Sequence, residues 1–387
     1  MSDTNNNLWD MLEIQEDTSN KSHGKNRTFA GDVWNRFKRK KSALIGLLII
    51  LFMVSFAVIG PAFTPYDYRM QQLDFVNIPP YFNAIVSDTT ENLVYITPNL
   101  KAIEVTPKGE LVGTLTRIKD DFNTRTITFD NYGETIYVSY ADNDITPMDE
   151  NGNANIKTKF MWNKTYLLGS DALGRDILTR LMYGARISFL VAFVAATVNI
   201  IIGIIYGGLS AYFGGVVDNI MMRIVEIIST IPLMLYVILI MMFFQNGLVS
   251  IIIALGTVYW VDMARVVRAQ SLTLKEQDFI YAAKTMGSST WFILTKHLIP
   301  NSMGPILVTV TMLIPSAIFM EAFMSFIGIG IAAPMASLGT MCNDAIESLR
   351  VAPYQMIMPA FAICITMFAF NFIGDGLRDA LDPKLIK

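Results

Sequence analysis

Long uncharged stretches dominate the second half of the chain and occur once near its start. Because a helix rises about 1.5 Å per residue, roughly 20 apolar residues are enough to cross a bilayer. The longest stretch, 227–261, exceeds one crossing, and Gln245-Asn246-Gly247 is its natural break. The pattern predicts six membrane spans, at 42–66 (ending near Pro61), 187–217, 222–244, 248–268, 305–331 and 351–374.

Residues 271–300 form the longest part of the second half that is too polar to lie in lipid. Within it, apolar or small residues follow the spacing of one helix face. They are Phe279, Ala282, Ala283 and Met286. The paired alanines carry little side-chain bulk, so another protein could approach this backbone closely.

A turn and a second helix are expected to follow that first helix. Gly287 suits the left-handed position that ends a helix, and Ser288 or Ser289 can cap the next one. Pro300 would end the second helix. One side of it would carry Trp291, Leu294 and Leu298. The segment is therefore predicted to be two short helices joined by a glycine turn, with a partner-free amphipathic hairpin as the alternative.

A polar insert, 64–168, separates the first two predicted spans. Its patches alternate in polarity or are rich in β-formers, and Lys108-Gly109 and Asn131-Tyr132-Gly133 are turn signals between them. The predicted strands are 93–96, 102–105, 111–118, 126–129 and 135–140. We expect a small β-rich domain on the extracellular side.

Charge predicts the orientation of the spans. A basic run at 36–41 abuts the first span and is expected to hold the N-terminus in the cytoplasm, with the C-terminus on the same side. Residues 1–35 would be a poorly ordered cytoplasmic tail, 36–63 the basic flank and first span, and 169–387 a core with five spans. Three arginines placed just outside the second span depart from the positive-inside tendency: Arg175, Arg180 and Arg186.

Composition supports a membrane protein. Of 387 residues, 52% are hydrophobic and 16% charged, and the mean hydropathy is +0.41, which is too apolar for an ordinary soluble enzyme. The chain has no G-x-x-x-x-G-K-[ST] sequence and so no phosphate-binding loop of its own. Its two cysteines and two histidines are scattered, which argues against a metal site.

Several motifs resemble those of ABC importer permeases. Tyr281-Ala282-Ala283, Gly287 and Ile299-Pro300 resemble the EAA loop that docks on the ATPase subunit, with Tyr281 where Glu is common. The run 168–186 resembles the signature before the second span of dipeptide, oligopeptide and nickel permeases, with Ser170 in place of Thr. The run 371–383 resembles the end of the C-type subunit. The resemblance covers most of 30–62 and nearly all of 168–383, and the insert lies outside it.

The resemblance implies an all-α polytopic protein with six transmembrane helices in the type I ABC importer fold. It implies a bacterial plasma-membrane subunit that passes oligopeptides from an extracellular binding protein. Its partners would be a homologous permease, two ATPase subunits that bind ATP and Mg, and lipid, with no nucleic acid and no cofactor of its own. The subunit would not be an enzyme. The alternatives are a permease for nickel or another small solute and, ranked behind it, a secondary transporter or channel.

Two sets of site residues follow. The resemblance assigns ATPase coupling to Tyr281, Ala282, Ala283, Gly287, Ser289, Trp291 and Pro300. The translocation path is expected to include Glu321, the single charge between Leu298 and Asn343, because a carboxylate in lipid usually faces a bundle interior or water. A structural hydrogen bond or ion pair is the slightly favoured alternative for Glu321. Met241 and Met242 are path candidates, with lipid or core packing as the preferred alternative.

Overall fold

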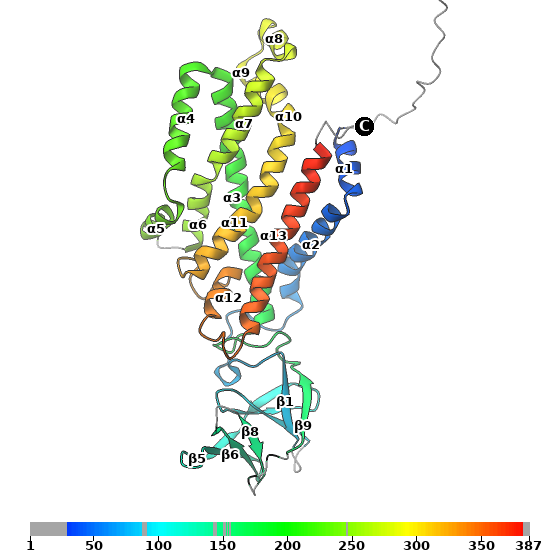
Figure 1. The fold of residues 1–387 in the computed structure, drawn as a ribbon, viewed down its shortest axis with the longest axis vertical. Helices are drawn as coiled ribbons and strands as arrows, with labels where there is room; N and C mark the ends of the chain where they lie inside the picture. Colours follow the sequence, from blue (N-terminus) through cyan, green and yellow to red (C-terminus); the bar gives the residue numbers. More distant parts are fainter. Residues whose placement is uncertain are drawn as a thin grey trace, which may run out of the picture.

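The structure is a computed structural model that describes residues 29–86, 91–141, 145–149, 152, 154, 156–244 and 247–381. The first 28 residues of the expected tail, and Gln245 and Asn246 of the expected break, lie outside these ranges. The molecule is a long helical bundle with a β-rich part at one end (Figure 1).

Within the described ranges, five helical segments are long and apolar enough to cross a membrane, or six if one bent pair counts as a span. The first five helices of the chain are α1 (Phe29–Arg39), α2 (Lys41–Val58), α3 (Ile177–Phe213), α4 (Gly215–Ser229) and α5 (Leu233–Phe244). The next five are α6 (Gly247–Val258), α7 (Trp260–Lys275), α8 (Asp278–Thr285), α9 (Thr290–Ile293) and α10 (Ile299–Asn301). The last three are α11 (Met303–Phe326), α12 (Leu338–Asp344) and α13 (Tyr354–Leu381).

The third predicted span, 222–244, is not one straight helix. Instead α4 and α5 meet at an angle of 83°. Pro232, directly before α5, cannot donate a backbone hydrogen bond to the preceding turn, which explains the break. The second span also ends earlier than the predicted residue 217. Gly214 and Gly215 take positive φ angles of 67° and 54°, which separate α3 from α4.

The second span begins ten residues earlier than predicted. Asp176 caps α3 by accepting a hydrogen bond from the backbone N–H of Thr179. Arg180 and Arg186 therefore lie in α3, which corrects the prediction that they precede the helix. Arg186 donates to the carbonyl oxygens of Ala57 and Val58 at the end of α2.

The start of the described chain also differs from the prediction. Residues 29–35, expected to belong to a poorly ordered tail, form most of α1. Phe37 of α1 is buried with Ala43 and Ala380, and Lys40 pairs with Asp379 at 2.6 Å. The apolar face of α1 thus gains a partner in α13, which accounts for its helical structure.

Small residues allow close helix packing in the bundle, where α3 runs along α7. A Cβ added to Gly207 would lie 2.3 Å from the carbonyl oxygen of Ala264. A backbone atom cannot rotate away, so the helices would have to separate.

We expect Gly207→Ala to lower the thermal unfolding midpoint in detergent. Overpacking costs about 1–3 kcal/mol, which exceeds the roughly 1 kcal/mol that Ala gains over Gly in a helix. Gly304→Ala is the matched control, because its Cβ would meet no atom closer than 3.9 Å and should keep or raise the midpoint. A Gly207→Ala midpoint at or above that of the control would refute the close packing.

The insert between α2 and α3 contains two antiparallel sheets. The first has the strand order β4-β3-β2-β1-β9 and the second β5-β6-β7-β8. The strands of the first sheet are β1 (Tyr81–Val86), β2 (Leu93–Ile96), β3 (Ala102–Val105), β4 (Leu111–Thr114) and β9 (Thr158–Trp162). Those of the second are β5 (Thr116–Asp121), β6 (Thr126–Asn131), β7 (Glu134–Ser139) and β8 (Thr146–Met148). A buried cluster that includes Val94 and Phe129 lies between the sheets.

The strand predictions were mostly right. Four of the five patches are strands, and Gly109 and Gly133 take the positive φ values that their turns need. The fifth patch, 111–118, is split between the two sheets at Leu115. The predictions missed β1, β8 and β9.

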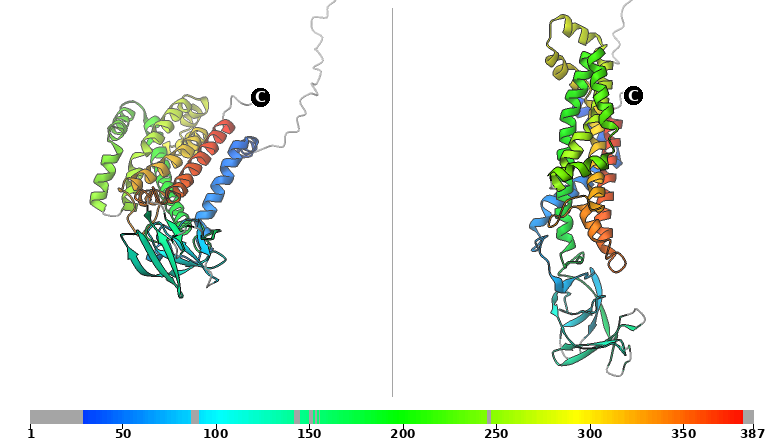
Figure 2. Two further views of the ribbon diagram at one scale, coloured as in Figure 1. Left: turned by 60° about the horizontal axis from the view of Figure 1, so that its bottom comes forward. Right: turned by 90° about the vertical axis from the view of Figure 1, so that its left-hand side faces the viewer.

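The insert lies at the opposite end of the bundle from α8 and α9 (Figures 1 and 2). The start of α1 and the end of α13 lie toward the α8–α9 end. Ser170, just before α3, bonds to Ile78 and Phe75, and Gln355 of α13 bonds to Asn77 and Ser170. The insert is thereby fixed to the bundle.

Candidate functional site

The segment between α7 and α11 projects beyond the end of the bundle (Figure 2, right). Its first helix, α8, is followed by Gly287 with φ +77°, and the Ser289 side chain accepts a hydrogen bond from the backbone N–H of Phe292. The predicted helix, glycine turn and capped second helix are therefore confirmed. The prediction that Pro300 ends the second helix is wrong, because helical turns continue through α10 to Asn301.

One side of this segment packs inside the chain. Ile280, Ala283, Ile293, Leu294 and Leu298 are buried together and contact Leu209, Tyr212 and Leu274. Ala283 is thus covered by its own chain. The prediction that Trp291 shares one side with Leu294 and Leu298 is wrong, because Trp291 is largely exposed whereas Leu294 and Leu298 are buried.

The other side is apolar and is not covered by the described part of the chain, and we call it the outward face. It contains Tyr281, Ala282, Met286 and Trp291. Met286 is 79% exposed, Trp291 62% and Tyr281 56%. Phe279 beside them is 40% exposed. Large apolar side chains gathered in this way mark a surface that another molecule covers.

An ion pair ties the base of the segment to the bundle. Arg268 of α7 donates to both carboxylate oxygens of Asp218 in α4, at 2.6 and 2.5 Å, and Ser210 of α3 bonds to the same carboxylate. Lys275 donates to the carbonyl oxygen of Ala211 at 3.0 Å. These bonds join three helices where the segment starts, so a displacement of α8 would be transmitted to α3, α4 and α7.

Glu321 is fully buried in α11. Its carboxylate accepts hydrogen bonds from Ser188 of α3 at 2.6 Å and from Ser325 at 2.9 Å. The Ser188 hydroxyl also accepts from the backbone N–H of Leu338, the first residue of α12. The side chain therefore links α3, α11 and α12.

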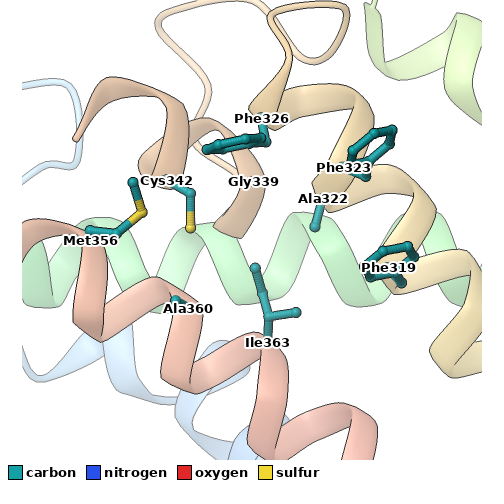
Figure 3. Close-up of a pocket in the computed structure, with 9 residues that line it drawn as sticks. All are labelled: Phe319, Ala322, Phe323, Phe326, Gly339, Cys342, Met356, Ala360 and Ile363. Atoms are coloured by element: carbon teal, nitrogen blue, oxygen red, sulfur yellow. The ribbon is translucent and has the colours of Figure 1, made fainter. Parts of the chain in front are cut away.

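The methionine candidates differ in their surroundings. Met241 packs at the edge of the main buried cluster, whereas Met242 is 71% exposed on α5. A cavity of about 260 Å³ lies elsewhere, between α11, α12 and α13 (Figure 3). Its lining includes Phe319, Phe323 and Ile363 and is almost entirely apolar, so it offers no hydrogen bonds to a peptide backbone.

A buried charge cluster lies at the end of the bundle near the insert. Asp171 accepts hydrogen bonds from Arg175, at 2.7 Å, and from Arg180. Both arginines also donate to one oxygen of Asp344 in α12, at 3.0 and 2.9 Å. Nearby, burial raises the pKa of the Asp176 carboxyl, although hydrogen bonds from Thr179 oppose the shift.

Sequence reasoning did not find this cluster. The sequence shows the motif at 168–186 and its arginines, but nothing in that run identifies Asp344, which is 164 residues from Arg180. The one available signal was the pair of arginines close to the start of a span. In the described part of the chain, no group of three or more His, Cys, Asp or Glu side chains could hold a metal ion.

The bundle and its apolar helices define a multi-pass membrane protein. The model of the family "Binding-protein-dependent transport system inner membrane component" matches residues 175–387, and that of the "N-terminal TM domain of oligopeptide transport permease C" matches residues 28–80. The chain belongs to the family of binding-protein-dependent transport system inner membrane components.

Similar proteins are found over most of the chain. A dipeptide transport system permease protein of Bacillus subtilis is 36% identical, over 92% of this chain and 87% of its own. An oligopeptide transport system permease protein of the same species is 50% identical, over 58% of this chain and 74% of its own. A solved methionine ABC transporter in an inward-facing conformation is 20% identical, with a TM-score of 0.45, over 52% of this chain and 96% of its own.

Proposed function

We propose that this chain is the permease subunit of an ATP-driven importer of oligopeptides, with the type I ABC importer fold. The outward face carries the proposal, because it is an exposed apolar surface on a short helical segment fixed at both ends to membrane spans. The chain has no phosphate-binding loop, so ATP hydrolysis would occur in partner subunits and act on this segment.

The partners follow from this function. Two ATPase subunits would cover the outward faces of this chain and of a homologous permease, and an extracellular binding protein would deliver the peptide. Both termini and the α8–α9 segment would be cytoplasmic, in a bacterial plasma membrane. Oligopeptides are preferred over nickel because the two similar permeases named above are peptide transport proteins.

Coupling would begin at Tyr281, Ala282 and Trp291, which a partner can reach. Ala283, Gly287, Ser289 and Pro300 would act by shaping the segment. When the ATPases move, the segment would transmit the movement to α7 and α11, between which it is attached, and the helix bundle would rock about the transport path.

We propose that Glu321 holds α3, α11 and α12 together, with no direct contact to the peptide. Each of its two carboxylate oxygens accepts a hydrogen bond from a serine hydroxyl, and the side chain is fully buried. Met241 and Met242 stay candidates for the path, but packing in the core for Met241 and contact with lipid for Met242 are the preferred roles.

Reconstitution tests the proposed function. Proteoliposomes that contain this chain, its homologous permease and the two ATPases should take up labelled peptides when ATP and the binding protein are supplied. Peptides of graded length would give the preferred size. Uptake of nickel ions without uptake of any peptide would refute the peptide proposal.

The insert would lie on the extracellular side and contact the binding protein. Tyr81 and Trp162 are cross-strand partners, so a two-residue Gly-Gly loop can replace residues 82–161. We expect the shortened chain to insert in the membrane and to retain its ATPases, but to lose affinity for the binding protein by about 10-fold or more. Delivery of peptide at the original rate would refute this role.

A further inference from the structure

A second cavity, of about 190 Å³, lies beside the charge cluster at the insert end of the bundle. It is formed by residues at the start of α3, the end of α11, the following loop and α12. The polar and charged side chains in its lining are Arg175, Arg180, Ser325, Thr340, Asn343 and Asp344. Water occupies about 30 Å³ per molecule, so the cavity has room for the end of a peptide but not for a whole oligopeptide.

The two arginines hold two carboxylates that differ in how firmly they are fixed. Asp171 is buried and also accepts backbone N–H bonds from Leu173 and Arg175, both at 2.9 Å. The Asp344 side chain is 40% exposed, and within the described chain it accepts hydrogen bonds from the two arginines. Asp344 is therefore the carboxylate that can leave.

The arginines also have unused binding capacity. Arg180 is 3% exposed, and its buried Nε–H has no hydrogen-bond partner in the described chain. A guanidinium presents five N–H donors in a planar fork suited to carboxylates. If Asp344 moved away, both guanidinium groups would regain donors beside the cavity.

We propose that this cavity binds the C-terminal carboxylate of the transported peptide, and that Asp344 occupies the arginines while no peptide is present. This proposal rests on the proposed function. A terminal carboxylate has the charge and shape of the Asp344 carboxylate, and it is common to all unmodified peptides whatever their side chains. Recognition of this group would let the permease accept many sequences.

The exchange would also release a contact between helices. Asp344 is the last residue of α12, and its bonds to Arg175 and Arg180 tie α12 to the start of α3. A peptide that replaced Asp344 would free the end of α12 at the outer mouth of the path. Binding of the peptide would thus favour the conformation in which Asp344 has left the arginines and the cavity is open.

The test compares a peptide with its C-terminal amide in the reconstituted transporter. The affinity of the binding protein for each peptide is measured separately, so that the comparison is made at equal occupancy. The unmodified chain should transport the free acid with an apparent affinity about 10-fold better than the amide, as expected for a charge-assisted contact.

Two variants sharpen the comparison. Asp344→Asn removes the competing charge with little change of shape, and should improve the apparent affinity for the free acid several-fold more than that for the amide. Arg175→Lys, which loses the planar fork, should reduce the preference for the acid. Asp379→Asn is the control, because it breaks an ion pair with Lys40 at the other end of the bundle and should leave the preference unchanged.

The outcomes are distinguishable. Equal transport of acid and amide by the unmodified chain and by Asp344→Asn would overturn the carboxylate site alone. Failure of the unmodified transporter to take up either peptide would overturn the proposed function as well. A preference for the acid that Asp344→Asn strengthens and Asp379→Asn does not would support the site.

Discussion

Ala282→Arg is expected to separate this chain from its ATPase subunits without unfolding it. Ala282 lies on the outward face, so a long charged side chain there would meet the partner and leave the packing of α8 intact. Trp291→Ala should weaken the same contact by about 2 kcal/mol, or roughly 30-fold, because exposed tryptophans at interface centres contribute most to binding. Copurification in detergent and ATP-driven peptide uptake are the measurements.

The controls distinguish docking from folding. Phe122 in the insert is 80% exposed, so Phe122→Ala removes an exposed aromatic ring far from the segment and should leave the ATPases bound. Ala283→Arg should instead disrupt the chain, because Ala283 is buried in the cluster that packs against α3 and α7. If Ala282→Arg keeps its ATPases and its rate of uptake, the outward face is not the docking surface.

Glu321→Leu is expected to destabilise the bundle strongly. The change would leave the hydroxyls of Ser188 and Ser325 buried without their acceptor, at about 1–3 kcal/mol for each unsatisfied group. The thermal unfolding midpoint in detergent should fall by roughly 5–10 °C.

Glu321→Gln separates the two roles considered for this residue. The amide oxygen can still accept from a serine, so we expect a midpoint close to that of the unmodified chain and peptide uptake within about 3-fold of it. A stable Glu321→Gln protein that had lost uptake would contradict the structural role and favour direct contact with a peptide amine.

Features set by nearby residues could be predicted from the sequence. The absence of charge located most of the spans, and Gly287 and Ser289 identified the turn and cap of the α8–α9 segment, because both act on the adjacent backbone. The turn at Gly133 was equally local. The bend before α5 also has a local cause, Pro232. It was not predicted because the spans were placed from the absence of charge, and Pro232 lies within an uncharged run.

Features that depend on distant residues could not be predicted. The pairing of Tyr81 with Trp162 joins strands 81 positions apart, and Asp344 meets Arg180 across 164 residues. The burial of the two alanines also depends on distant residues. Ala283 lies in the buried cluster that packs against α3 and α7, whereas Ala282 is exposed. Periodicity shows that a face exists, whereas the tertiary contacts decide which residues it buries.

A photo-crosslinking amino acid in place of Trp291, in the complete transporter within its membrane, tests most directly whether the α8–α9 segment receives the ATPase movement. The account predicts a crosslink to an ATPase subunit that changes in yield between the ATP-bound and ATP-free states, and none from the same probe in place of Phe122. A probe at position 291 that crosslinks only to lipid, or to the extracellular binding protein, would contradict it.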